Sequence, residues 1–244
     1  MSNWFGLSID QAFYPFGISH NIMLAIYLIG IISMLCIYKQ IINNTTFYQA
    51  IRWLFFFLLL FSEISYQLWA AVNGVWNLRD HMPLHLCGVA SIIAMIALLF
   101  NKEKLIQFAF FIGIIPAFLA LVTPELPYDY QHFRFWKFFV HHIVISWACV
   151  FLILTSTARI TFKSFIGSFC ILVGYGIFIG ILINPLLGSN YLYLSNTPTA
   201  STPLNFFGTG FWYYSNLGLV TLSVFFLLFV CYSLYEKHQL KKVH

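Results

Sequence analysis

The chain has 244 residues, of which 61% are hydrophobic, 20% aromatic and only 8% charged. A soluble domain does not have that balance, so the composition favours a polytopic membrane protein. The net charge of +5 is not a nucleic-acid signal, because the basic residues are divided among several loops and the tail and form no single basic face.

Seven apolar segments occupy most of the chain. A helix needs about 20 apolar residues to cross the hydrocarbon of a bilayer, and each segment is close to that length. We therefore expect an all-α membrane protein, with residues 1–244 forming a single bundle of seven transmembrane helices. The segments run over about 20–38, 52–75, 84–100, 105–122, 136–155, 162–186 and 211–235.

The lysines and arginines predict the orientation of the bundle. Seven crossings put the termini on opposite sides of the membrane. Nine basic residues fall on one side: Lys39, Arg52, Lys102, Lys104, Arg159, Lys163, Lys237, Lys241 and Lys242. Three fall on the other: Arg79, Arg134 and Lys137. By the positive-inside rule we expect a multi-pass protein of the cell membrane with its N-terminus outside and its C-terminus cytoplasmic.

The cysteines and histidines do not have the spacing of a metal site. No CxxC or HExxH pattern occurs, the single HxxxH pattern (His81 and His85) is interrupted by Pro83, and no nucleotide-binding loop is present, so we expect neither a metal nor a cofactor. For every cysteine except Cys87, we expect the role of a small buried hydrophobic residue. The five cysteines are Cys36, Cys87, Cys149, Cys170 and Cys231.

Chemistry-bearing residues gather on the expected outer face. The outer connections 75–83, 123–135 and 187–210 are longer than inner ones such as 101–104. Loops held on a rigid scaffold commonly carry function. Six of the eight histidines map to this face or to the outer ends of helices: His20, His81, His85, His132, His141 and His142. A functional site should therefore open outward.

Cys87 and His142 are expected at similar depth on two helices that both start from the outer face. A thiol needs a base or a positive neighbour to become a useful thiolate, which suggests nucleophilic acyl chemistry through a thioester. Packing is the alternative role for Cys87. His141 is adjacent to His142, so only one of the two should face the site. His85 and Cys87 point about 200° apart on a regular helix, so both can face one site only if the helix starts after His85, which Pro83 permits. His85 could orient the loop or the site.

Glu63 lies near the centre of the second segment, where an ionisable group is costly and is by default a functional candidate. Tyr66 and Gln67 follow at three and four residues, so the three should form one polar stripe facing the bundle. Glu63 could accept a proton or orient a histidine. Alternatively, it is a protonated carboxyl that joins helices through hydrogen bonds.

The connections before the fifth and seventh segments supply candidate substrate contacts. Arg134 could hold a phosphate or carboxylate with two parallel hydrogen bonds, or it could anchor the helix at the interface. The 187–210 connection carries Tyr191, Tyr193 and Phe206, so we expect it to be ordered over the outer mouth. Tyr191 is the candidate substrate contact in it.

Three stretches carry a resemblance to known families: MPLHLCGVAS, LVTPELPYDYQHFRFWKFFVHH, and NPLLGSNYLYLSNTP followed by FWYY. Across about residues 50–215 the chain resembles the YwaF-type bacterial integral membrane family. That type is remotely similar to the eukaryotic transmembrane protein 164 family, whose members move a fatty acyl chain between phospholipids through a cysteine and a histidine.

The resemblance implies a membrane-embedded acyltransferase in a bacterial cytoplasmic membrane, acting on a lipid or lipidated acceptor at the outer leaflet. It makes Cys87 the matching cysteine, and His142 or His141 the matching histidine. YwaF-type sequences commonly carry an acidic residue after the cysteine, where this chain has Gly88; Glu63 is a candidate for that role.

Two other functions stay open on the sequence alone. A proton-coupled transporter or small-molecule-binding protein would use the polar stripe of the second segment, and Pro116 would break the fourth segment. A non-catalytic accessory subunit is the third possibility. The sequence does not indicate an oligomeric state.

Overall fold

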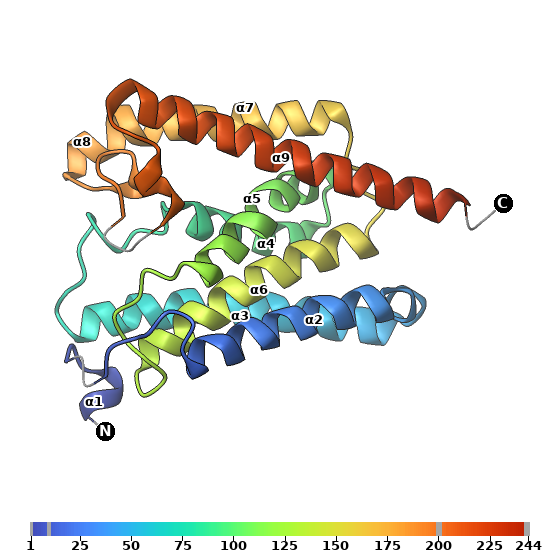
Figure 1. The fold of residues 1–244 in the computed structure, drawn as a ribbon. Helices are drawn as coiled ribbons and strands as arrows, with labels where there is room; N and C mark the ends of the chain where they lie inside the picture. Colours follow the sequence, from blue (N-terminus) through green and yellow to red (C-terminus); the bar gives the residue numbers. More distant parts are fainter. Residues whose placement is uncertain (1, 9–10, 199–201, 242–244) are drawn as a thin grey trace.

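A computed structural model describes residues 2–8, 11–198 and 202–241 as helices joined by loops, with one isolated β-bridge between Ala12 and Tyr128 (Figure 1). Lys242, one of the nine basic residues expected on the cytoplasmic side, lies outside the described residues. The helices are α1 (Ser2–Phe5), α2 (Ile18–Asn43), α3 (Thr45–Val72), α4 (Leu86–Phe100), α5 (Glu103–Val122), α6 (Phe133–Thr155), α7 (Phe162–Phe178), η1 (Ile179–Ile183), α8 (Asn184–Leu187), η2 (Tyr191–Tyr193), η3 (Pro203–Phe206) and α9 (Gly210–Lys241).

The seven predicted apolar helices are confirmed as α2 to α7 and α9. Six of the helical stretches are long and apolar enough to cross a membrane. The exception is α4, whose 15 residues rise only about 22 Å against a hydrocarbon core of about 30 Å. α4 is shorter than the predicted 84–100 because the chain turns at Pro83 and the helix begins only at Leu86.

Two helices depart from the simple expectation. α5 continues as one helix through Pro116, so the predicted break is absent. The sixth segment instead changes geometry near its end, where the π-helix η1 joins α7 to the short α8. Such π-helical turns are rare and often occur at functional sites.

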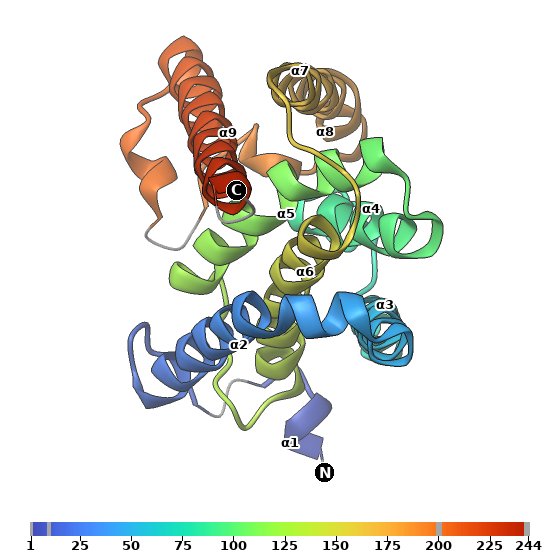
Figure 2. The ribbon, with the colours of Figure 1, turned by 90° about the vertical axis from the view of Figure 1, so that its right-hand side faces the viewer.

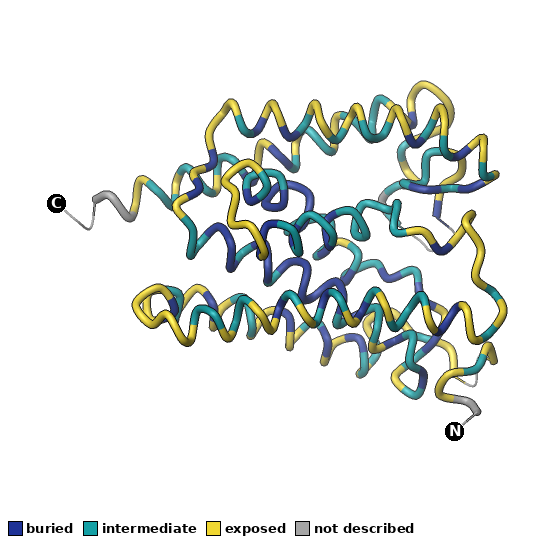
Figure 3. Tube along the Cα trace, turned by 180° about the vertical axis from the view of Figure 1, so that it is seen from behind, coloured by how far each residue is buried: buried dark blue, intermediate teal, exposed yellow. Residues whose placement is uncertain are grey.

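α6 is the central helix of the bundle. Viewed end-on, α6 is surrounded by α2, α3, α4 and α5, while α7 and α9 form a pair on the far side of α4 and α5 (Figure 2). Of the six long spans, α6 is the most buried, and α9 is the least buried (Figure 3). Polar groups on α6 are therefore the ones most removed from lipid.

The connections 73–85, 123–132 and 188–198 lie at the same end of the bundle as the N-terminus, and the C-terminal end of α9 lies at the other (Figure 1). We call the first of these the loop-rich end. The termini therefore lie at opposite ends, as seven crossings require.

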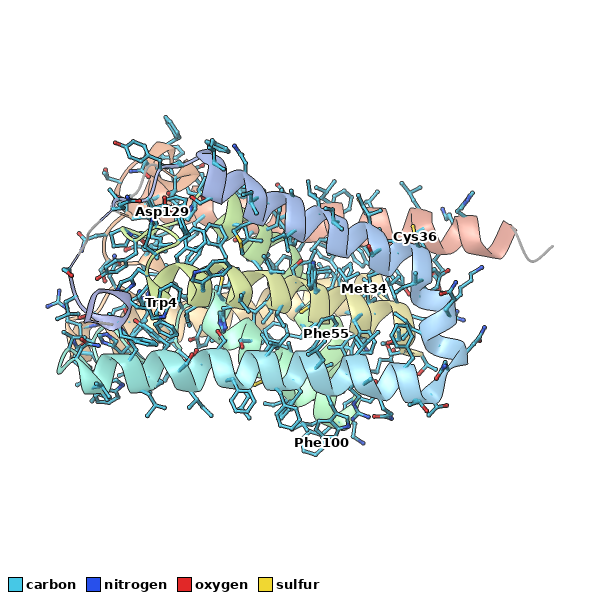
Figure 4. All side chains as sticks on the ribbon, turned by 90° about the horizontal axis from the view of Figure 1, so that it is seen from below. Trp4, Met34, Cys36, Phe55, Phe100 and Asp129 are labelled. Atoms are coloured by element: carbon cyan, nitrogen blue, oxygen red, sulfur yellow. The ribbon has the colours of Figure 1, made fainter. Side chains whose placement is uncertain are left out.

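The outer surface is apolar, as a lipid-facing surface should be. Phe100 projects away from the bundle and is 63% exposed (Figure 4). The expectation that cysteines other than Cys87 are buried holds only for Cys149. The three that are exposed on this surface, and so contradict it, are Cys36, Cys170 and Cys231. Thiols are apolar enough to face lipid, so these three cysteines need not be buried inside the bundle.

Candidate functional site

α3 and α6 run antiparallel, and two aromatic contacts fix their register. Near the far end of the pair, the rings of Phe55 and Phe151 are 5.6 Å apart. At the loop-rich end, the guanidinium carbon of Arg134 lies 4.7 Å from the centre of the Trp69 ring. Midway between these contacts, residues 62–63 of α3 are level with residues 141–142 of α6.

Two hydrogen bonds fix α4 against α3 in the same way. Arg52 Nε donates to the carbonyl oxygen of Leu98 (2.5 Å), and Gln67 Nε2 donates to that of His81 (2.8 Å). Counting inward from both contacts places Cys87 level with residues 62–63.

These two registers define one layer of the bundle, in which Cys87, Glu63 and His141 lie at similar depth on three helices. α3, α4 and α6 each pack against the other two. The sequence predicted that Cys87 and His142 lie at similar depth, and the contacts between helices add the carboxyl of α3 to this layer. No hydrogen bond joins Cys87 to either histidine in the described part of the chain. Catalytic hydrogen bonds are often long before a substrate binds.

Cys87 is half-buried and is the second residue of α4, two residues after the N-cap residue His85. The amide groups of a helix N-terminus carry partial positive charge, which favours a thiolate there. The ammonium group of Lys137 also lies within electrostatic range of the Cys87 thiol. Burial of the thiol disfavours the charged form most strongly, and these two surroundings oppose that effect.

Lys137 connects the charged groups of the site, and the sequence did not single it out. Its Nζ atom lies 4.5 Å from the centre of the Tyr66 ring. It interacts electrostatically with Glu63, Arg134 and Cys87, which lie on three different helices. The helical spacing of Arg134, Lys137 and His141, at three and then four residues, was the available signal, because it puts all three on one face of α6.

The polar stripe of α3 faces this group. Gln67 Nε2 donates to Glu63 Oε1 (2.7 Å), and Gln67 Oε1 accepts from Trp76 Nε1 (2.7 Å). The Tyr66 ring stacks on His81 at 5.6 Å between ring centres, and the Arg134 guanidinium lies 4.7 Å above Tyr66. Gln67 and Tyr66 therefore attach the 73–85 connection to α3 beside the charges.

The two adjacent histidines of α6 have different surroundings. His142 Nδ1 lies 2.7 Å from the carbonyl oxygen of Phe138, one turn earlier, and its ring packs on the Phe138 ring. His141 Nδ1 is buried and has no hydrogen-bond partner in the described part of the chain. His141 also shares a face of α6 with Lys137, from which it is four residues removed. His142 is turned about 100° further round the helix.

A second group of polar side chains joins the start of α4 to the 123–132 and 188–198 connections. The hydroxyl of Tyr193 donates to Glu125, and the His85 ring lies 5.2 Å from the Tyr193 ring. Tyr193 also lies within electrostatic range of Cys87. Leu192 and Tyr193 both have positive φ (59° and 55°), a left-handed conformation that costs free energy in non-glycine residues and often marks functional sites.

Tyr191, a predicted substrate contact, is completely buried. Its hydroxyl donates to the carbonyl oxygen of Leu78 (2.6 Å) and accepts from the amide of Met82 (3.1 Å). Its own amide donates to Asn184 Oδ1 (2.9 Å). These bonds give Tyr191 a role in holding the 73–85 connection against the 188–198 connection.

Burial also sets the charge of the two histidines in these connections. Burial lowers the pKa of His85, and the carboxylates of Glu125 and Asp80 oppose that shift. Burial likewise lowers the pKa of His81. Both rings are therefore neutral near pH 7, so the candidate site has uncharged imidazoles at its mouth.

Gly88 is required by close packing. A Cβ atom at residue 88 would lie 2.6 Å from the carbonyl oxygen of Pro83. An acidic side chain at residue 88 therefore does not fit between α4 and the turn before it. Glu63, level with Cys87, is the carboxyl that the site does contain.

The described residues include no group of three histidines, cysteines or carboxylates placed to bind a metal ion. The family model described as the TMEM164 family matches residues 15–229, which include all seven apolar helices except the end of α9. This match confirms the predicted similarity to the transmembrane protein 164 family; the YwaF-type resemblance stays a prediction. No curated protein and no solved structure matches the chain.

Proposed function

The chain belongs to the TMEM164 family, and on that basis we propose that this multi-pass membrane protein is an acyltransferase. It moves a fatty acyl chain from a lipid to a lipid or lipidated acceptor at the outer leaflet of a bacterial cytoplasmic membrane. An acyl donor that already lies in the bilayer would reach α4 from the apolar surroundings of the bundle.

One observation carries the proposal: Cys87 lies in the first turn of α4, level with His141 and within electrostatic range of Lys137. A thiol, a base and a positive charge are the parts that a cysteine acyltransferase needs. We propose Cys87 as the nucleophile and His141 as the general base, because His141 Nδ1 has no competing partner. His142, bonded to its own helix, is the alternative base.

In the first half-reaction, the base removes the proton of Cys87 and the thiolate attacks the ester carbonyl carbon. The carbon–sulfur bond forms as the carbon–oxygen bond of the ester breaks. The proton passes from the imidazolium to the departing alkoxide, which leaves as a hydroxyl-bearing lysolipid. Lys137 and Glu63 keep the charge around the thiolate balanced.

In the second half-reaction, the acceptor hydroxyl gives its proton to the base and attacks the thioester. The carbon–sulfur bond breaks, and the imidazolium returns its proton to the Cys87 thiolate. Arg134, held by the rings of Tyr66 and Trp69, would contact a phosphate group of the lipid. That places the headgroup at the loop-rich end and the acyl carbonyl deeper, beside Cys87.

The test is acyl transfer in proteoliposomes that contain a phospholipid with a labelled acyl chain and an unlabelled lysolipid. Cys87→Ala should abolish transfer of the label, and Cys149→Ala, at a buried thiol of α6, should not. Transfer that persists in Cys87→Ala would contradict the mechanism.

Proton-coupled transport is the second candidate, because a lysine and a carboxyl interact at membrane depth between α3 and α6. It predicts substrate flux that depends on Glu63 and not on Cys87. Flux measured in proteoliposomes with Glu63→Gln and Cys87→Ala therefore separates the two functions.

A further inference from the structure

Within the membrane helices of the described chain, three buried side-chain atoms have no hydrogen-bond partner: Ser62 Oγ, Ser91 Oγ and His141 Nδ1. These residues are only 8%, 1% and 3% exposed. Buried polar groups are nearly always bonded, because water is not available to replace a missing partner. Three such atoms on three neighbouring helices call for an occupant.

The two serines could have satisfied their hydroxyls locally and do not. Elsewhere in this chain, Ser65, Thr155 and Ser233 donate to carbonyl oxygens three or four residues earlier, at distances of 2.7 to 3.0 Å. This local bond is the usual arrangement for hydroxyls in apolar helices. Ser62 and Ser91 therefore present free donors to the interior of the bundle.

The three residues lie close to the depth of Cys87 on the three helices. Ser62 precedes Glu63 in the layer that contains Cys87, on the face of α3 that packs against α6. Ser91 follows Cys87 by one helical turn on the same face of α4, about 5–6 Å away between Cβ atoms. His141 is the α6 member of that layer. A group bound among them would lie within reach of the Cys87 sulfur.

We propose that Ser62, Ser91 and His141 line a binding site for the ester carbonyl of an acyl lipid, with both serine hydroxyls donating to the carbonyl oxygen. This inference rests on the proposed acyl transfer. When the thiolate attacks, negative charge develops on that oxygen, and donors already aimed at it stabilise the transition state. The same two hydroxyls would also hold the oxygen of the thioester.

The binding test compares an ester with an ether that lacks the carbonyl. The protein is placed in nanodiscs of a dialkyl-ether phosphatidylglycerol, with or without a small fraction of dioleoyl phosphatidylglycerol. The ester lipid should raise the midpoint of thermal unfolding of the wild type and of Cys87→Ala. It should have no effect on the double variant Ser62→Ala/Ser91→Ala. The proposed site is contradicted if the ester lipid does not raise the unfolding midpoint of the wild type. It is also contradicted if the ester lipid still raises the midpoint of the double variant.

Stability separates a binding role from a structural one. Ser62→Ala and Ser91→Ala remove an unpaired hydroxyl, so each should unfold at the same or a higher temperature than the wild type in pure ether lipid. Ser146→Ala is the matched control, because Ser146 is buried and bonded to the Tyr27 hydroxyl at 3.0 Å. It should lower the unfolding midpoint and keep the ester effect. A double variant destabilised in pure ether lipid shows a structural or water-binding role and overturns the site.

Activity separates this inference from the proposed function. Each serine variant should lower kcat about 10²-fold, as loss of one oxyanion donor does, with little change in KM. If Cys87→Ala loses transfer while the wild type shows no ester effect, only the carbonyl site fails. If the ester lipid raises the unfolding midpoint while Cys87→Ala keeps transfer, the proposed mechanism through Cys87 fails and the carbonyl site stands.

Discussion

At the scale of single residues, the charge of Lys137 should control the reactivity of Cys87. Lys137→Met removes the positive charge beside the thiol and should slow its alkylation by a maleimide at pH 7 about tenfold, whereas Lys137→Arg should keep most of the rate. The measurement is mass spectrometry of a background with Cys36→Ala, Cys170→Ala and Cys231→Ala. Buried Cys149 should stay unmodified and so report that the fold is intact. An unchanged Cys87 rate in Lys137→Met contradicts the assignment.

The two histidines of α6 provide a second test at this scale. A general base typically contributes 10²- to 10⁴-fold to the rate. His141→Ala should therefore lower kcat for acyl transfer at least about 100-fold. His142→Ala, which removes a ring bonded to Phe138, should lower it less than about tenfold. If His142→Ala instead lowers kcat more than His141→Ala, the general base is His142, the histidine that the sequence predicts at the depth of Cys87.

At the scale of elements, the start of α4 depends on Gly88. Gly88→Ala pushes a methyl group against the backbone of Pro83 and should cost about 1–3 kcal/mol of stability, because the turn must move. Gly167→Ala is the control, since no atom lies within 4 Å of a Cβ there. The midpoint of thermal unfolding should fall only in the first variant; equal midpoints would show that the turn before α4 yields easily.

The contact between α4 and the 188–198 connection should depend on pH through His85. Its pKa is lowered by burial, so the unfolded chain takes up a proton near pH 6.5 and the folded protein only at lower pH. Stability is complete above pH 6.5 and is lost as the pH falls toward the lowered value, by at most about 1.4 kcal/mol per unit. His85→Gln should lose less stability than the wild type between pH 7.5 and pH 5. Equal losses in thermal unfolding would contradict this.

At the scale of the whole molecule, the seven helices could be predicted because each apolar segment has a length set by the bilayer. The depth of Cys87 and of the α6 histidines followed from counting along those helices. The start of α4 was predicted at Leu84, two residues early, but the sequence also allowed a helix that starts after His85, and the structure has that start because the chain turns at Pro83.

The rest of the site depends on contacts between helices, which a single sequence does not show. Lys137 was not singled out, because only the packing of α3 against α6 places Tyr66 and Glu63 near its ammonium group. The hydrogen bonds of the Tyr191 hydroxyl to Leu78 and Met82 could not be predicted either, and its role as a substrate contact stays a prediction. Which end of the bundle faces outward remains the prediction of the positive-inside rule. Labelling a cysteine introduced in place of exposed Tyr130 with an impermeant reagent on intact cells would test it.

The central claim is that Cys87 carries the acyl chain during transfer. The most direct measurement is the intact mass of the protein after brief incubation with an acyl lipid donor and no acceptor. We expect a population heavier by one acyl group, located at Cys87 by peptide mapping, removed by neutral hydroxylamine and absent from Cys87→Ala. An acyl adduct elsewhere, or transfer without any adduct on Cys87, would contradict the account.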